Sequence, residues 1–369
     1  MLDSDVPLTG SILQLYNLSR AWQKAGVEVI YLTTTRNECL PSEEEYEGLR
    51  VLRCHIPKRQ MIYSGKSLPK VMDIIHAVSP DVIYLRGRSD LQLVAGQYCK
   101  THNCRVVWGT NGEDSLEWWR QCTRLWRSRR SLFSKLVLFP FAFYNDLRIH
   151  KGMKMADVVV NQTEHQQKRT LEQLGKNGVL LPNYLLPPDE KQNTERNSIL
   201  WMATVSPTKQ PDVFLMIVED LQKRLPHIKF HLVGKSNDAN YFASLSEKAQ
   251  RLGVEMPGFC DYNGTWNYYQ NACIFISTSL REGLPNSFIQ AWQMGTPVFS
   301  LNIDPNGWLA QKSIGFCSQG DLTLLEDKIV ETVMNKDEWQ KMSLNASTFA
   351  KKTFSNPNII KSYLEVFQG

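Results

Sequence analysis

The residues best suited to chemistry lie in a short loop that follows an apolar strand late in the chain. Glu282 and Gly283 belong to this loop, and Pro285 stands near the start of a predicted helix that Asn286 or Ser287 can cap. A helix N-terminus presents backbone N–H groups without partners inside the helix, together with about half a positive charge. Gly283 has no side chain, so a ligand can approach the loop backbone closely. The loop can therefore hold a diphosphate or sugar oxygens, while Glu282 accepts hydrogen bonds from sugar hydroxyls.

A regular alternation of strands and helices surrounds this loop. In the first half, strands at residues 81–85 and 105–108 flank a helix at 91–101, and the alternation restarts at Ile199. Short apolar strands that alternate with helices predict parallel sheets covered on both faces. The sequence therefore predicts an α/β fold.

The chain is predicted to form two domains. Its 369 residues exceed the roughly 250–300 that one hydrophobic core serves, and the polar, proline-containing stretch 183–197 suits a linker. We expect two Rossmann-like domains facing each other across a cleft, because ligands of such sheets bind beyond the carboxyl ends of the strands. We place the domains at residues 1–185 and 196–355, with a C-terminal helix at 356–369 that packs back on the first domain. No strand precedes the first helix, so the first strand is short or missing.

The late loop and helix resemble the retaining glycosyltransferases of family 4, the glycosyl transferases group 1, which have the GT-B architecture. Their signature is a Glu, seven residues and a second Glu, written around E-G-x-P and followed by A-x-x-x-G-x-P-V. The chain matches it from Glu282 to Val298, except that Gln290 takes the second Glu position. The resemblance implies that Glu282 contacts the donor sugar as a catalytic residue and that Gln290 binds the nucleotide ribose. The other donor-binding residues that it implies here are Gly283, Leu284, Pro285 and Asn286.

A second match lies at residues 201–210. In the family this loop carries an Arg and a Lys that grip the donor diphosphate; Lys209 fits the Lys, and Thr204 stands where the Arg is expected. One ammonium can neutralise one phosphate charge, whereas a missing Arg removes a bidentate contact. The resemblance thus makes Lys209 catalytic. It also adds four donor-binding residues, of which two precede the first helix and one ends a strand: Gly10, Ser11, Thr204 and Gly234.

Aromatic residues occur where the family meets the nucleotide base. Gly258 and Phe259 fall at this place by the resemblance. Large apolar side chains are nevertheless found in cores more often than against a base. We therefore expect Met256, Phe259 and Trp266 to be core residues.

Candidate acceptor contacts follow a strand of the first half. Asn111, Glu113 and Asp114 come after the strand at 105–108, and we expect their side chains to face the cleft. Glu113 or Asp114 could orient an acceptor hydroxyl, and solvation of the loop explains them equally well. The resemblance implies front-side attack assisted by the leaving phosphate, so no separate base is required.

The sequence carries little sign of a metal or a cofactor. Asp3-Ser4-Asp5 has the D-x-D spacing that binds metal in another glycosyltransferase architecture, but there the triplet lies deep in the chain, and a G-x-G-x-x-G fingerprint is absent. None of the eight cysteines forms a C-x-x-C pair, so we expect reduced thiols. We predict no metal and no bound cofactor, with a UDP- or GDP-linked sugar as the donor substrate.

Residues 118–154 interleave aromatic and basic side chains. This composition suits an element at an anionic lipid surface, and an ordinary helix pair with solvated arginines is the alternative. The longest nearly apolar run, 136–144, is shorter than the about 20 residues of a spanning helix. We expect a cytoplasmic protein, with peripheral contact to the inner membrane as the membrane alternative. A net charge of only +5 and the lack of a nucleic-acid module argue against nucleic acid.

Together these features predict a hexosyltransferase. It would move a hexose from a nucleotide diphosphate sugar to a glycan or lipid-linked glycan with retention, in cell-surface polysaccharide or lipopolysaccharide biosynthesis. Two alternatives stay open. One is a non-catalytic nucleotide-sugar-binding subunit, which Thr204 and Gln290 favour; the other is a nucleotide-sugar epimerase of the same architecture.

Overall fold

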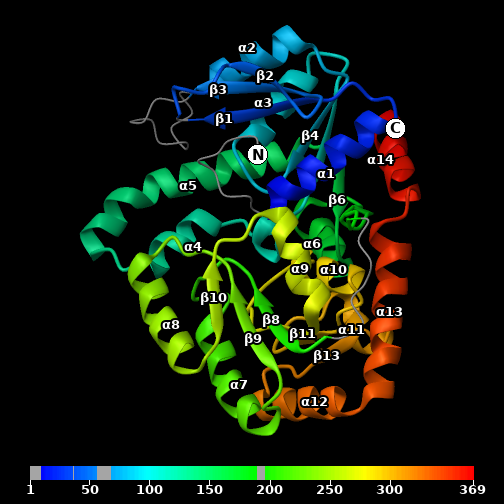
Figure 1. The fold of residues 1–369 in the computed structure, drawn as a ribbon. Helices are drawn as coiled ribbons and strands as arrows, with labels where there is room; N and C mark the ends of the chain where they lie inside the picture. Colours follow the sequence, from blue (N-terminus) through cyan, green and yellow to red (C-terminus); the bar gives the residue numbers. More distant parts are fainter. Residues whose placement is uncertain (1–9, 36, 56–67, 189–195) are drawn as a thin grey trace. The chain divides into compact units, whose positions relative to one another are not determined.

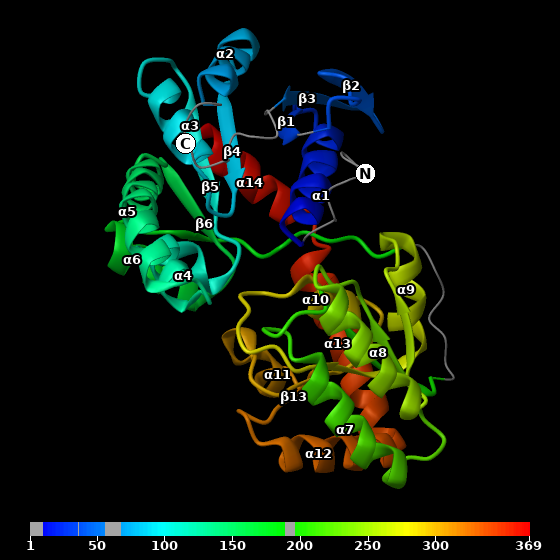
Figure 2. The same ribbon diagram turned by 90° about the vertical axis from the view of Figure 1, so that its left-hand side faces the viewer.

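The computed structural model describes residues 10–35, 37–55, 68–188 and 196–369. These residues form two compact units (Figures 1 and 2). Unit 1 contains the described residues up to Tyr184 together with Pro357–Gly369, and unit 2 contains Leu185–Asn356. The Asp3-Ser4-Asp5 triplet lies outside the described residues.

Unit 2 is built on one six-stranded sheet in the order β10-β9-β8-β11-β12-β13, in which every pair is parallel (Figure 1). The central strands are short and apolar, as parallel strands covered on both faces are. Their bounds are β8 (Ser198–Met202), β9 (Lys229–Val233), β10 (Glu255–Gly258), β11 (Ala272–Ser277), β12 (Val298–Ser300) and β13 (Gly315–Cys317).

Helices cover both faces of this sheet, and the side chains of β11 alternate between them. Ile274 and Ile276 join a buried cluster with α7 (Pro211–Arg224), α8 (Ala239–Arg251) and α12 (Leu322–Met334). Phe275 points to the other face, where its ring lies 6.0 Å from that of Phe288. The other helices of unit 2 are α9 (Tyr262–Asn271), α10 (Asn286–Gln293), α11 (Trp308–Gln311) and α13 (Lys336–Phe354), with a short 3-10 turn, η3 (Pro305–Gly307).

Unit 1 contains two separate short sheets (Figure 2). One has the order β1-β3-β2, with β1 and β3 parallel and β2 antiparallel, and the other is a parallel sheet in the order β4-β5-β6-β7. The antiparallel β2 hairpin had no counterpart among the predicted strands. The bounds are β1 (Ile30–Thr35), β2 (Glu43–Tyr46), β3 (Leu49–His55), β4 (Val82–Arg86), β5 (Arg105–Gly109), β6 (Val158–Asn161) and β7 (Val179–Leu180).

The helices of unit 1 also lie on two faces of its strands. α1 (Gly10–Lys24) and α14 (Asn358–Gln368) pack side by side against β5 and β6, and the rings of Trp22 and Tyr363 meet edge to face at 5.5 Å. α3 (Leu91–Cys99) and α5 (Leu132–Lys154) pack on the opposite side. The remaining helical segments are α2 (Leu68–Val78), η2 (Glu113–Leu116), α4 (Arg120–Arg127) and α6 (Glu164–Leu174).

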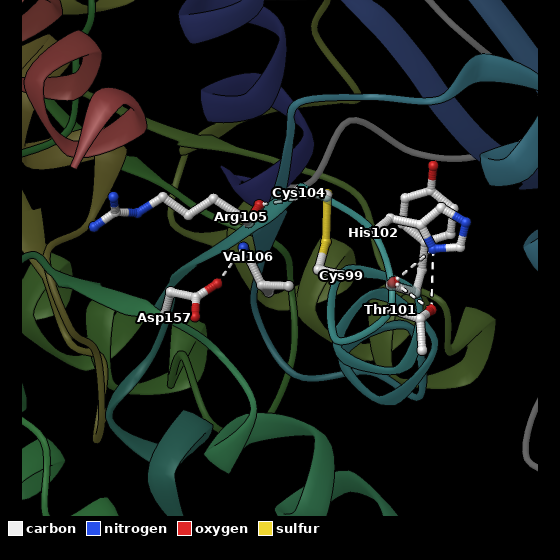
Figure 3. Close-up of a disulfide and its surroundings, with 8 residues drawn as sticks. Cys99, Thr101, His102, Cys104, Arg105, Val106 and Asp157 are labelled. Atoms are coloured by element: carbon white, nitrogen blue, oxygen red, sulfur yellow. Dashed lines mark hydrogen bonds between the residues drawn. A yellow bond between two sulfur atoms is a disulfide. The ribbon is translucent and has the colours of Figure 1, made fainter.

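Two sequence-based expectations for unit 1 are wrong. Gly10 and Ser11 were placed in a loop before the first helix, but they form its first turn. All cysteines were expected to be reduced, but Cys99 and Cys104 form a disulfide (Figure 3). Cys99 ends α3 and Cys104 directly precedes β5, and the Cα atoms of the two cysteines lie 4.6 Å apart. A spacing of five residues in the sequence does not indicate this proximity.

Among the helices of the described ranges, none is both long enough and apolar enough to cross a bilayer.

Candidate active site

The predicted site residues of unit 2 lie in loops at the carboxyl ends of its central strands. The loop after β8 and the loop after β11 are joined by a backbone hydrogen bond from Leu280 N–H to the Thr208 carbonyl, at 3.0 Å. The Thr278 hydroxyl donates to the Lys209 carbonyl at 2.8 Å and accepts from the Trp201 indole N–H at 2.9 Å. These hydrogen bonds join the two loops that carry the family signature, at the carboxyl ends of β8 and β11.

Lys209 and Glu282 form an ion pair across these two loops, so the two predicted catalytic residues are in contact. Their side chains are 23% and 22% exposed, and the Ser279 hydroxyl donates to Glu282 Oε1 at 3.3 Å. Burial lowers the pKa of Lys209 to about 8. The ammonium and the carboxylate neutralise each other and stay partly open to solvent, as groups that exchange partners with a ligand would be.

The turn at the start of α10 differs from the prediction in its cap. Pro285 is the N-cap residue and no side chain caps the helix, so neither Asn286 nor Ser287 plays this role. A proline has no N–H. Of residues 283–286, only Gly283, Leu284 and Asn286 therefore carry a backbone donor. Gly283 and Leu284 are buried, and Glu282 and Asn286 are half-buried.

Gln290 lies in the second turn of α10 and is 7% exposed. Its amide nitrogen donates to the Thr265 hydroxyl of α9 at 3.4 Å. A ribose hydroxyl at this place would compete with Thr265 for that amide, so ribose binding by Gln290 stays a prediction.

Gly234 is needed for the close approach of β8 and β9 at this edge of the sheet. Its φ of +150° is strained for other residues, and a Cβ there would lie 1.9 Å from the Ala203 carbonyl oxygen. Gly234 thus serves packing, since any side chain would push the loop after β8 outward. Thr204, one residue beyond Ala203, is exposed on that loop.

Two residues beside Gly234 belong to this surface and were not predicted as site residues. The Lys235 carbonyl accepts the Val205 N–H at 2.9 Å, and the Lys235 ammonium lies 4.9 Å from the centre of the Phe259 ring. Phe259 is 62% exposed, so its assignment to the core is wrong, whereas Trp266 is buried as expected. Lys235 and Phe259 could have been predicted from the sequence as site residues, because each directly follows a glycine at the end of a strand, Gly234 or Gly258.

The predicted acceptor residues belong to unit 1. Asn111 follows β5, where its N–H donates to the Ser115 hydroxyl at 3.2 Å. Glu113 begins η2. The Asp114 carboxylate is already paired with Arg120 and lies 3.5 Å from Arg124, so an acceptor hydroxyl would compete with two guanidinium groups for it.

A buried polar network holds the start of this acceptor loop in place. The Thr110 hydroxyl donates to Gln166 Oε1 at 2.8 Å, and the same oxygen accepts the Gln162 N–H at 2.9 Å. The Gln162 side-chain amide donates to the Thr110 carbonyl at 3.0 Å. These buried hydrogen bonds tie the base of the loop after β5 to β6 and α6.

Comparison with known proteins agrees with this architecture. The model of the glycosyl transferases group 1 matches residues 185–347, and that of glycosyltransferase family 4 matches residues 10–183. An uncharacterized glycosyltransferase of Haemophilus influenzae is 25% identical over 193 residues, or 51% of this chain and 54% of the relative, so the match spans about half of that protein. An alpha-monoglucosyldiacylglycerol synthase of Streptococcus pneumoniae is 22% identical, over 94% of this chain and 81% of the relative.

Solved structures show the same fold. Sucrose-phosphate synthase of Thermosynechococcus elongatus superposes with a TM-score of 0.73 at 16% identity, covering 98% of this chain and 93% of that one. WaaG, a glycosyltransferase involved in lipopolysaccharide biosynthesis, gives a TM-score of 0.70 at 12% identity, over 99% and 97% of the two chains. With two α/β units of this kind and family matches that together span residues 10–183 and 185–347, the chain belongs to the glycosyl transferases group 1 and has the two Rossmann-like domains of the GT-B fold.

Proposed function

We propose that this glycosyltransferase moves a hexose from a nucleotide diphosphate sugar to a glycan or lipid-linked glycan, with retention of the anomeric configuration. The observation that carries the proposal is the Lys209–Glu282 ion pair at the carboxyl edge of the unit 2 sheet. It puts a cation for the leaving diphosphate and a carboxylate for sugar hydroxyls side by side. The relative named for diacylglycerol glucosylation and the lipopolysaccharide enzyme support a lipid-linked acceptor.

The chemistry follows from where charge develops. When the bond to the anomeric carbon breaks, negative charge grows on the diphosphate, and fixed donors at that place lower the barrier. Lys209 and the amides of Gly283, Leu284 and Asn286 are the donors we assign to it. Glu282 then leaves its pair with Lys209 to accept hydrogen bonds from the donor sugar and to orient it.

Lys235 is assigned a second phosphate contact. Since Glu282 neutralises Lys209, the pair contributes little net charge before the donor binds. The Lys235 ammonium sits over the face of the exposed Phe259 ring, a contact that holds a cation at the surface without cancelling its charge. It lies next to the loop of Thr204, where the family has its arginine.

The base of the donor is proposed to be uracil. Three similar structures are described with UDP or a UDP sugar: TarM of Staphylococcus aureus, the pneumococcal transferase GtfA and the trehalose-6-phosphate enzyme of Escherichia coli. These likenesses lie between 9% and 15% identity, so GDP-linked sugars belong in the same screen.

We further propose that unit 1 contacts the cytoplasmic face of an anionic membrane through α4 and α5. The first three turns of α5 expose Phe133 to 77%, Leu136 to 57% and Phe141 to 67%, in a helix that begins after Arg129 and Arg130. Exposed aromatic and aliphatic groups bordered by cations suit the boundary between headgroups and acyl chains. Such contact would bring a lipid-linked acceptor to the enzyme.

The direct test is sugar transfer by Glu282→Ala. With UDP- and GDP-hexoses and lipid-linked acceptors, we expect the variant to lose at least a hundredfold in kcat while its circular dichroism is unchanged. Glu331→Ala, which removes an exposed carboxylate of α12, is the matched control and should keep full activity. Equal transfer by wild type and Glu282→Ala would overturn the site.

Product analysis separates the alternatives. A transferase releases a nucleoside diphosphate and forms a glycoside whose anomeric proton coupling reports retention. An epimerase would return an isomerised nucleotide sugar, and a binding subunit would bind the donor without either product.

A further inference from the structure

Two arginines on successive turns of α4 direct their side chains at one carboxylate. Residues four apart share a face of a helix, so Arg120 and Arg124 lie side by side. Arg120 Nη2 is paired with Asp114 Oδ2, and Arg124 Nη2 lies 3.5 Å from the same oxygen. We call Arg120 and Arg124 the α4 arginine pair. Its two positive charges meet one negative charge, which leaves an excess of one positive charge.

Asp114 holds the α4 arginine pair against the loop after β5. A Cβ on Gly112 would lie 3.1 Å from Asp114 Oδ1, so the carboxylate rests on the loop backbone. The N–H groups of Asn111 and Gly112 both donate to the Ser115 hydroxyl, at 3.2 and 3.1 Å. These loop amides are thus occupied, and the arginines supply the cationic donors beside the predicted acceptor residues.

The α4 arginine pair has more hydrogen-bond donors than Asp114 can satisfy. Each guanidinium carries five N–H donors, whereas a carboxylate offers about four acceptor positions in total. Both arginines meet the same oxygen, Oδ2. The Nε of Arg120 is buried, and the described part of the chain provides no partner for it. An anion with more oxygens would therefore reach donors that Asp114 leaves open.

The α4 arginine pair is open to solvent, so a ligand can reach it. The Arg124 side chain is 64% exposed, that of Asp114 39% and that of Arg120 22%. Ion pairs of such exposure contribute little to stability, so a ligand can replace Asp114 at a small cost. The pair of Arg88 with Asp146 differs, because both of its side chains are almost fully buried.

The occupant has to displace a carboxylate that is fixed on the same loop. A second carboxylate has the same charge and the same number of oxygens, so it gains nothing over Asp114. A phosphate monoester carries a charge of about −1.5 to −2 at pH 7 and three acceptor oxygens. Guanidinium groups bind phosphate oxygens in a bidentate way. The site therefore favours a phosphate monoester or a diphosphate.

An aromatic surface borders the α4 arginine pair. Trp119 directly precedes Arg120, and its ring stacks on that of Phe143 of α5, with the ring centres 5.1 Å apart. Both side chains are exposed. Aromatic rings bury apolar groups, which include the C–H faces of sugars and lipid chains. The organic part of a bound phosphate would thus find an apolar surface beside the arginines.

We propose that the α4 arginine pair is a phosphate-binding subsite for the acceptor, in which a phosphate monoester or diphosphate displaces Asp114. The proposal rests on the proposed function, because it takes unit 1 as the unit that binds the acceptor. Asp114 keeps the two guanidinium groups in place until the acceptor arrives. The phosphate belongs to a lipid headgroup or to a phosphorylated sugar.

Isothermal titration calorimetry of the full chain at pH 7 measures the subsite. Glycerol 3-phosphate and glycerate are matched probes, because one carries a phosphate monoester and the other a carboxylate on a small hydroxylated chain. We expect the wild type to bind glycerol 3-phosphate at least tenfold more tightly. Equal affinities for the two probes would overturn the proposal.

Two double variants separate the subsite from the general charge of this region. Arg120→Gln with Arg124→Gln should weaken binding of glycerol 3-phosphate at least tenfold. Arg127→Gln with Arg129→Gln removes the same charge from two exposed residues and should leave the affinity unchanged. If the two double variants bind equally, the assignment to Arg120 and Arg124 is wrong.

Asp114→Asn predicts a gain that a folding defect cannot produce. It removes the competing charge and keeps the side-chain shape, so it should bind glycerol 3-phosphate at least threefold more tightly than the wild type. Weaker binding would overturn the proposal, because Asp114 would then belong to the site rather than compete for it.

Lys209→Ala separates this proposal from the proposed function. It removes the cation of the proposed donor site, so sugar transfer should be lost while the affinity for glycerol 3-phosphate stays unchanged. Lost affinity would place the phosphate at the donor site and overturn the proposal. Surviving transfer with unchanged affinity would count against the proposed donor site alone and support the subsite.

Dihexanoyl phosphatidic acid, below its micellar concentration, identifies the source of the phosphate. It carries the same phosphate on two short acyl chains, and dihexanoylglycerol is its neutral control. Tighter binding than glycerol 3-phosphate, with no binding of the neutral lipid, would support a lipid headgroup. Equal binding of the two phosphates would support a phosphorylated sugar. Equal binding of both lipids would assign the surface to acyl chains and overturn the proposal.

Discussion

At the scale of single residues, the proposed donor site is a set of charges that neighbouring side chains hold in place. Glu282 accepts one hydrogen bond from Ser279 and forms an ion pair with Lys209, while the Thr278 hydroxyl donates to the Lys209 backbone carbonyl. Removing charges from water is costly unless they are paired. The pair therefore keeps both side chains in place at a partly buried edge until a donor takes over each partner.

The lowered pKa of Lys209 predicts a pH limit for the enzyme. A lysine carries its charge below its pKa, and burial brings that of Lys209 to about 8. We expect kcat/KM for the donor to fall as pH rises through about 8. Lys209→Arg, whose guanidinium stays charged, should keep the remaining activity level to pH 9 or above. Parallel pH profiles of the wild type and Lys209→Arg would contradict this assignment.

Lys235 gives a second prediction at this scale. Lys235→Ala should raise the donor KM about fivefold to tenfold, since a cation close to a phosphate at a protein surface contributes on the order of 1 kcal/mol. Thr204→Arg in the same variant should restore much of the affinity, because residues 204 and 235 lie on neighbouring loops joined by the Val205 hydrogen bond. Lys312→Ala, an exposed lysine elsewhere in unit 2, should leave the KM unchanged. Failure of the Arg rescue would place Lys235 outside the phosphate site.

The sequence predicted that Glu282 and Lys209 belong to one site, and the structure brings them into contact, but the sequence did not predict their surroundings. Glu282 and Lys209 could be found from the sequence because each lies within a few residues of a predicted strand end and a predicted helix start. The pairing of Asp114 with Arg120 depends on where α4 returns in space, and so does the contact of Gln290 with Thr265. Such contacts come from packing between elements, which a pattern along the chain does not encode.

At the scale of elements, one buried charge pair adds to the apolar packing that holds the helices α4 and α5 in unit 1. Arg88, after β4, meets Asp146 of α5 at 2.7 Å, and both side chains are almost fully buried. Asp146 also accepts the N–H groups of Gln121 and Cys122 at the start of α4. A single carboxylate thus links a strand end, a helix N-terminus and the middle of a second helix.

Breaking this link should destabilise the protein strongly. Asp146→Ala leaves a buried guanidinium without its counter-charge, and such changes cost about 3–5 kcal/mol. Asp327→Ala removes one of the two carboxylates that pair with the partly exposed Arg224 and should cost about 0–1 kcal/mol. Urea unfolding of the two variants measures the difference. Equal midpoints would show that the Arg88–Asp146 pair does not hold the helices.

Regular elements followed from the sequence better than irregular ones. The helix that the sequence predicts at 164–174 has these bounds, since Thr163 caps it. The strand that the sequence predicts at 274–277 ends at Ser277 as expected but begins two residues earlier, at Ala272. The Glu-rich β2 was not predicted, because glutamates disfavour strands and β2 exists through its pairing with β3. β13, Gly315–Cys317, is too short to show a period and is formed by its contact with β12.

At the scale of the whole molecule, the proposed chemistry and the proposed membrane contact fall to different units. The residues proposed to bind the donor belong to unit 2, and the exposed apolar face of α5 belongs to unit 1. An enzyme with a lipid-linked acceptor needs both, because the donor is water-soluble and the acceptor stays at the bilayer surface. Membrane contact should therefore be separable from donor binding by mutation.

Vesicle binding tests this division. Phe133→Ser with Phe141→Ser removes two exposed rings from α5, each worth about 1.5–3 kcal/mol when buried in the bilayer. We expect binding to phosphatidylglycerol vesicles to weaken at least tenfold, with donor affinity unchanged. Met334→Ser with Leu344→Ser removes equally exposed apolar groups of unit 2 and should not alter vesicle binding. Salt should weaken the wild-type interaction because it screens the basic residues. If both double variants bind as the wild type does, or if neutral vesicles bind as well as anionic ones, α5 does not dock on an anionic membrane and its apolar face must meet another surface.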